Sequence, residues 1–135
     1  MKIPWTERIL WIIGFCFLFF IINVVFPEPH HPTDKDYAQA IVGEASNQSV
    51  GTMICVAHAL RNRGNLRGVN GYNAPHIKNE SKLTWRKAEI AWELSGKEKE
   101  DPVHGASNFG TFDDLEDVGV NTEDTIAQCG DFYFY

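Results

Sequence analysis

Hydrophobic positions follow two different patterns along this chain. From Ile9 to Phe26, 18 successive residues carry no charge, and only Asn23 is clearly polar. From residue 34 onward, apolar residues instead recur at helical spacing between polar and charged ones. An 18-residue helix rising about 1.5 Å per residue just spans a hydrocarbon core of ~30 Å. The pattern therefore predicts one N-terminal transmembrane helix followed by a folded domain.

The charges beside the apolar run predict its orientation. Lys2 and Arg8 precede it, whereas Glu28 and Asp34 are the first charges after it. The excess of positive charge places the N-terminus in the cytoplasm and the rest in the periplasm or outside the cell. A cleaved signal peptide is the competing interpretation, but the end of the run lacks small residues for a cleavage site. We expect an uncleaved anchor over residues 1–27, giving a single-pass protein of the cytoplasmic (inner) membrane.

The remainder of the chain divides into a short linker and one domain. Residues 28–33 directly follow Pro27 and contain two further prolines, which predicts a stiff, extended linker. Residues 34–135 are enough for one small domain with a single core. Residues 28–135 carry 10 Lys and Arg against 17 Asp and Glu. This balance argues against a nucleic-acid partner, because nucleic acids attract clustered positive charge.

Periodicity and capping residues predict a mostly helical α+β domain with a small sheet. Apolar residues at helical spacing predict helices over 34–45, 50–63 and 83–95. Gly, Asn and Pro predict a loop over 67–82, and a run of six acids without a base predicts a solvated loop over 113–124. An extended segment over 106–112 and an aromatic strand over 132–135 complete the prediction.

The cysteines and histidines restrict the chemistry. Cys55 and Cys129 fall in the exported part, where a disulfide can form, and two buried thiols are an equal alternative. None of the five histidines stands at a spacing typical of a zinc site. We expect neither a metal nor a cofactor.

Glu44 is the strongest candidate for catalysis. It follows Ile41 and Tyr37 by three and seven positions, at the edge of the apolar face of a predicted helix. Partial burial disfavours the charged carboxylate and raises its pKa, so such a group can remain protonated and act as a general acid. The alternative is that Glu44 only forms the polar border of an amphipathic helix.

Several short motifs occur in an order that suggests a family. They are Gly43-Glu44-Ala45, Asn62-Arg63, Asn73-Ala-Pro-His76, Lys87-Ala-Glu-Ile-Ala-Trp-Glu93, Asp101-Pro-Val-His-Gly-Ala106 and Cys129-Gly-Asp-Phe-Tyr-Phe-Tyr135. The order resembles the cell wall hydrolase family of spore cortex-lytic enzymes and related phage and bacterial muralytic proteins, over roughly residues 36–135. The resemblance implies a lysozyme-like fold and cleavage of peptidoglycan glycan strands between N-acetylmuramic acid and N-acetylglucosamine.

Two segments are candidates for contact with the sugar. Tyr72, Asn73 and His76 combine a ring face with hydrogen-bonding groups and match a stretch of the family, although a loop held by its own side chains would carry the same residues. Ser107 and Asn108 follow Gly105-Ala106, where the family carries Thr-His, an aromatic residue and Glu. Here the stretch ends in Phe109-Gly110 instead.

Glu44 has no obvious carboxylate partner in the sequence. Asp101 precedes a proline and is expected to cap a turn, and Asp113 and Asp114 fall in the acidic loop. A single carboxyl group suits a lytic transglycosylase, because the C6 hydroxyl of the muramyl sugar is itself the nucleophile. Hydrolysis by water would use the same residue.

The sequence therefore supports two alternative functions. The first is a membrane-anchored peptidoglycan lytic transglycosylase or muramidase, which cuts glycan near the membrane for an assembly or in phage lysis. The alternative is a non-catalytic module that keeps the fold to bind glycan or a membrane-associated partner. The altered segment Ser107–Gly110 and the negative charge of the domain favour this alternative.

Overall fold

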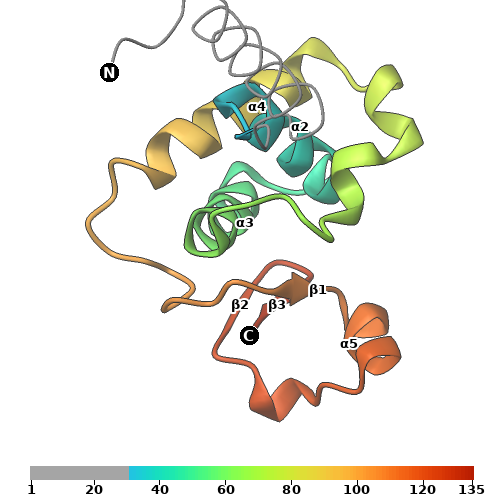
Figure 1. Ribbon diagram of the computed structural model, residues 1–135, viewed down its shortest axis with the longest axis vertical. Coiled ribbons are helices and arrows are strands. Elements are labelled where there is room, and N and C mark those ends of the chain that lie inside the picture. The colour runs from blue at the N-terminus through green and yellow to red at the C-terminus, as the bar shows by residue number, and fades with distance from the viewer. Residues whose placement is uncertain (1–30) are drawn as a thin grey trace, which may run out of the picture. The chain divides into compact units, whose positions relative to one another are not determined.

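The computed structural model describes residues 31–135, so the predicted anchor over 1–27 and most of the linker lie outside the described residues. The described part is α+β and mostly helical, as predicted (Figure 1). Its α-helices are α2 (Asp34–Ala45), α3 (Val50–Arg63), α4 (Lys82–Ser95) and α5 (Phe112–Val118). Between residues 31 and 135, no helix combines the length and hydropathy that crossing a membrane requires.

Local signals explain where the three longer helices begin and end. Thr33 and Asp36 form a capping box at the start of α2. Ser49 and Ser81 accept backbone hydrogen bonds at the N-termini of α3 and α4, as serine commonly does there. Gly64 ends α3 with a φ of 71°, a left-handed conformation that glycine adopts without strain. The three predicted helices are confirmed, with α4 beginning one residue earlier than expected.

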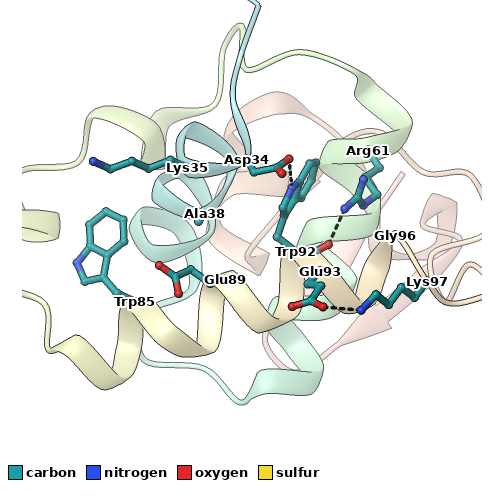
Figure 2. Close-up of a pocket in the computed structure, with 10 residues that line it drawn as sticks. All are labelled: Asp34, Lys35, Ala38, Arg61, Trp85, Glu89, Trp92, Glu93, Gly96 and Lys97. Carbon is teal, nitrogen blue, oxygen red and sulfur yellow. Dashed lines mark hydrogen bonds and ion pairs between the residues drawn. The ribbon is translucent and has the colours of Figure 1, made fainter.

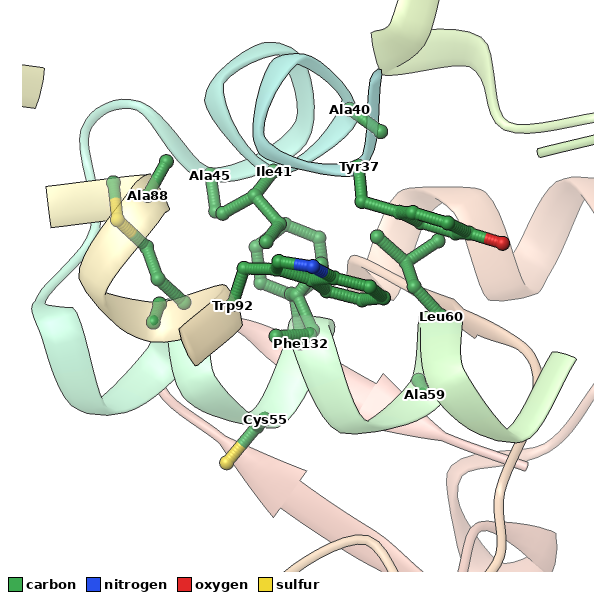
Figure 3. Packing of buried hydrophobic residues seen from close by; sticks show 14 of the residues in the cluster. Tyr37, Ala40, Ile41, Ala45, Cys55, Ala59, Leu60, Ala88, Trp92 and Phe132 are labelled. Carbon is green, nitrogen blue, oxygen red and sulfur yellow. The ribbon is translucent and has the colours of Figure 1, made fainter. Parts of the chain in front are cut away.

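Helix α3 is central to the hydrophobic core. Met53, Val56 and Leu60 have no exposed surface, and α3 packs against both α2 and α4. On the neighbouring helices, the rings of Tyr37 and Trp92 stack with centroids 4.2 Å apart and planes 8° from parallel (Figure 3). Burial of these large apolar side chains is the main source of stability that holds α2 in place.

A small antiparallel sheet forms the C-terminal part of the domain. Its strands are β1 (Phe109–Gly110), β2 (Ala127–Cys129) and β3 (Phe132–Phe134), in the order β1-β3-β2. Phe132 and Phe134, two positions apart on β3, share one face of the strand and are buried in the core. A disulfide between Cys55 and Cys129 joins α3 to β2, which decides between the two alternatives for these cysteines.

Two loop predictions were wrong. The acidic stretch 113–124 contains α5 and the 3-10 helix η3 (Thr122–Asp124). Thr111 and Asp114 form a capping box, Leu115 is buried, and acidic residues in the first turn suit the helix dipole. The stretch 67–82 holds two 3-10 helices, η1 (Asn70–Asn73) and η2 (Pro75–Asn79).

Candidate active site

Glu44 lies in the last turn of α2, where η1 packs against the helix. The backbone N–H of Gly71 donates a hydrogen bond of 2.6 Å to Oε1 of Glu44. Within residues 31–135, no hydrogen bond reaches the other carboxyl oxygen, Oε2. When the carboxyl group is protonated, Oε1 therefore serves as the acceptor and Oε2 carries the proton.

Two glycines allow this close approach between α2 and η1. A Cβ added to Gly43 would overlap the carbonyl group of Gly71. A Cβ added to Gly71 would lie 2.5 Å from Cγ of Glu44. Each distance is shorter than a carbon side chain tolerates, so glycine is required at both positions for the backbone of η1 to reach the carboxyl group.

The surroundings of Glu44 raise the pKa of its carboxyl group. Burial is the largest cause and raises the pKa, and the negative charge of Asp114 acts in the same direction. The hydrogen bond from Gly71 and the charges of Arg63 and His76 lower it, but they do not outweigh burial. The shift keeps the proton on Glu44 to a higher pH than an exposed glutamate would allow.

Glu44 opens into a cleft of about 350 Å³ between the helical part and the C-terminal part of the domain. The cleft combines three carboxyl side chains, one guanidinium group, amide side chains and two aromatic rings. Its lining residues are Glu44, Arg63, Gly68, Val69, Asn70, Asn108, Phe109, Asp114, Asp117, Val118 and Tyr135. A cleft with a partly buried acid, hydrogen-bonding groups and aromatic rings has the composition expected of a sugar site.

Of the predicted sugar contacts, Asn108 lines this cleft with Glu44. Its backbone exchanges two hydrogen bonds of 3.0 Å with Tyr135, which fixes β1 beside the end of β3. Ser107 is partly buried and does not line the cleft.

The three predicted sugar contacts in η1 and η2 do not line the cleft. The hydroxyl of Tyr72 donates to Asp36 at 2.9 Å, so this group ties η1 to α2. Asn73 and His76 are exposed and do not line the cleft, although the charge of His76 acts on Glu44. The structure therefore brings Glu44 together with Asn108, but leaves the other four predicted contacts outside the cleft lining.

Several lining residues were not predicted. Asp114 and Asp117 belong to α5, and Phe109 and Tyr135 come from the sheet and its end. The spacing Thr111-x-x-Asp114 is a capping-box signal and could have indicated α5. No local pattern could have indicated that α5 lies opposite Glu44.

Other polar residues of the motifs hold the domain together. Asp101 accepts hydrogen bonds from the N–H groups of Val103 and Gly105, which confirms its role as a turn cap. The side chain of Asn62 donates to Asp101 and to the carbonyl of Ala106.

A second and larger hollow, of about 760 Å³, lies between α2 and α4 (Figure 2). One of its two indole rings, that of Trp92, is already engaged: Nε1 donates to Asp34 at 2.7 Å, and the Arg61 guanidinium lies 3.7 Å from the ring centroid. Glu93 pairs with Lys97, which lowers the pKa of this glutamate. In the larger hollow, the indole of Trp92 and the carboxyl groups of Asp34 and Glu93 therefore already have partners within the domain.

Comparison of the chain with protein-family models, with curated proteins and with solved structures found no match.

Proposed function

We propose that this protein is a membrane-anchored enzyme that cleaves peptidoglycan glycan strands between N-acetylmuramic acid and N-acetylglucosamine, as a lytic transglycosylase. One observation carries the proposal. Glu44 combines a raised pKa with a fixed orientation, since one oxygen is held by Gly71 and the other is left for the cleft. A general acid requires both properties.

The reaction needs one proton donor and one nucleophile. Protonated Glu44 gives its proton to the oxygen that links the two sugars, and the bond from this oxygen to C1 of the muramyl sugar breaks. The C6 hydroxyl of the same sugar then bonds to C1 and returns its proton to Glu44. The products are a 1,6-anhydromuramyl end and a free hydroxyl on N-acetylglucosamine, and Glu44 is protonated again.

The other features of the chain support this function. The resemblance to the cell wall hydrolases supplies the substrate class and the lysozyme-like fold. The apolar run Ile9–Phe26 supplies the anchor, with the domain on the outer side of the cytoplasmic membrane. The disulfide between Cys55 and Cys129 suits such an oxidising location.

The test compares the full-length chain in mild detergent with two variants, Glu44→Gln and Glu89→Gln. Each is incubated with purified peptidoglycan, and the soluble products are weighed by mass spectrometry. We expect anhydro-muropeptides from the wild type and from Glu89→Gln, whose exposed side chain lies on α4, and none from Glu44→Gln. Hydrated reducing ends would instead identify a muramidase. If no variant releases products but all bind glycan, the protein is a binding module.

A further inference from the structure

We propose that Asp114 is a second carboxylate of the active site, placed to stabilise the positive charge that develops on the muramyl sugar while Glu44 donates its proton. This inference rests on the proposed glycan cleavage. The sequence alone indicated no obvious carboxylate partner for Glu44.

Asp114 is held in one orientation by its neighbours. Its Oδ2 accepts hydrogen bonds of 2.7 Å from both the backbone N–H and the hydroxyl of Thr111. Its Cβ lies so near Gly110 that a side chain there would approach it to 2.8 Å. Within residues 31–135, no hydrogen bond reaches Oδ1. Like Glu44, Asp114 lines the cleft and has one oxygen fixed by a backbone N–H.

The two carboxyl groups differ in their surroundings. Glu44 is partly buried at the end of α2, whereas Asp114 is exposed on α5, in the wall of the same cleft. Arg63 from α3 and Asp117 from α5 also line this cleft, and His76 from η2 acts on Glu44 from outside it. Two carboxyl groups with environments this different are typical of glycosidic cleavage, where one remains protonated and the other carries a charge.

The chemistry defines a role for the charged partner. When the proton leaves Glu44 and the bond to C1 breaks, the bonding electrons go to the leaving oxygen, and positive charge spreads over C1 and the ring oxygen. A fixed carboxylate in the cleft stabilises this charge without forming a bond, and it is already in place before the reaction begins. The C6 hydroxyl then bonds to C1, and its proton passes to Glu44, so Asp114 is unchanged at the end.

Two variants separate the charge of Asp114 from its capping role. Both Glu and Gln complete a capping box with Thr at this distance. Asp114→Glu therefore keeps the cap and the charge, whereas Asp114→Gln keeps the cap and removes the charge. Asp113→Asn is the matched control, because this neighbour is exposed in the same helical turn but does not line the cleft.

The experiment measures kcat, KM and the pH profile of the full-length chain on purified peptidoglycan, with the melting temperature as a check on folding. We expect Asp114→Gln to lose about 100-fold in kcat with little change in KM. We also expect its alkaline loss of activity to begin at a lower pH, because removal of a negative charge makes protonated Glu44 a stronger acid. Asp114→Glu should recover most of the activity, and Asp113→Asn should match the wild type.

The outcomes distinguish this inference from the function on which it rests. If the wild type is active and Asp114→Gln matches Asp113→Asn in rate and pH profile, the second carboxylate is refuted and the glycan cleavage stands. Equal losses in Asp114→Gln and Asp114→Glu would also refute it, because the charge would then be irrelevant. If the wild type releases no product, the proposed function fails, and this inference fails with it.

Discussion

The amide nitrogen of Gly71 lies 2.6 Å from Oε1 of Glu44, and this hydrogen bond joins η1 to the last turn of α2. It fixes the carboxyl group in one orientation and assigns different roles to its two oxygens. The contact depends on the absence of a side chain at Gly71 and at Gly43, which faces it across the same packing. The geometry of the Glu44 carboxyl group is therefore set by backbone packing.

Replacement of Gly71 by alanine should disturb both the site and the fold. The new Cβ would lie 2.5 Å from Cγ of Glu44, so the carboxyl group or η1 must move. Overpacking of this kind costs about 1–3 kcal/mol, and we expect a loss of unfolding free energy in that range. Activity on peptidoglycan should fall at least about tenfold, because a displacement of about 1 Å at a catalytic group is costly. Chemical denaturation and product release measure the two effects.

Gly51→Ala is the control for that substitution. Gly51 lies in α3, and a Cβ there would meet its nearest neighbour, Oγ of Ser49, at 3.7 Å, an ordinary contact. Alanine is favoured over glycine in a helix by roughly 0.5–1 kcal/mol, so this variant should be slightly more stable and fully active. Equal behaviour of the two variants would show that the close packing at Gly71 does not matter.

Glu44→Gln should change the pH dependence of stability. Burial raises the pKa of Glu44, so the folded protein binds more protons than the unfolded chain between the ordinary pKa and the raised one. Its unfolding free energy therefore falls as the pH rises through this interval. Glutamine cannot ionise but still accepts from Gly71, so the variant should gain stability relative to the wild type as the pH rises through this interval. Thermal denaturation across this range, with Glu89→Gln as control, measures the difference, and parallel curves would contradict the raised pKa.

Local signals in the sequence were sufficient to predict the three longer helices. The pairing of Thr33 with Asp36 and the stop at Gly64 act within a few residues, and α2 and α3 span the predicted ranges 34–45 and 50–63. Helix α5 was missed because its acidic residues suggested hydration, and only Leu115 is buried to indicate a packed face.

The composition of the cleft depends on contacts that sequence patterns do not encode. Glu44 could be selected from its place on α2, since helical spacing reports which face is apolar. Asp114 lines the same cleft because the disulfide joins the sheet to α3, Phe132 and Phe134 pack in the core, and α5 contacts β1. Tyr72 was expected to contact the sugar, yet its hydroxyl is hydrogen-bonded to Asp36 on α2. This partner could not be inferred from the sequence of the loop alone.

Asp101→Ala should destabilise the turn after α4. Burial acts to raise the pKa of Asp101, but the hydrogen bonds that this side chain accepts outweigh it and hold the pKa below its usual value. The stabilisation is therefore present above the ordinary pKa and is lost as the pH falls through the lowered one. We expect the variant to lose about 1–2 kcal/mol at pH 7 and less at pH 3. Glu100→Ala, at an exposed neighbour, is the control for denaturant titrations, and an equal loss in both variants would contradict the capping role.

Removal of the disulfide should weaken the wall of the cleft opposite Glu44. Cys55 and Cys129 are 74 positions apart, and a cross-link over such a loop contributes about 4 kcal/mol when it acts by restricting the unfolded chain. Cys129→Ser should therefore lower the unfolding free energy by several kcal/mol, and reductant should do the same to the wild type. Activity should fall with it, because Asn108 and Tyr135 belong to the part that the disulfide ties to α3. Cys16→Ser changes the third cysteine of the chain and should leave both quantities unchanged. A reduced wild type that remained as stable and active as the oxidised form would show that Phe132 and Phe134 alone hold the sheet in place.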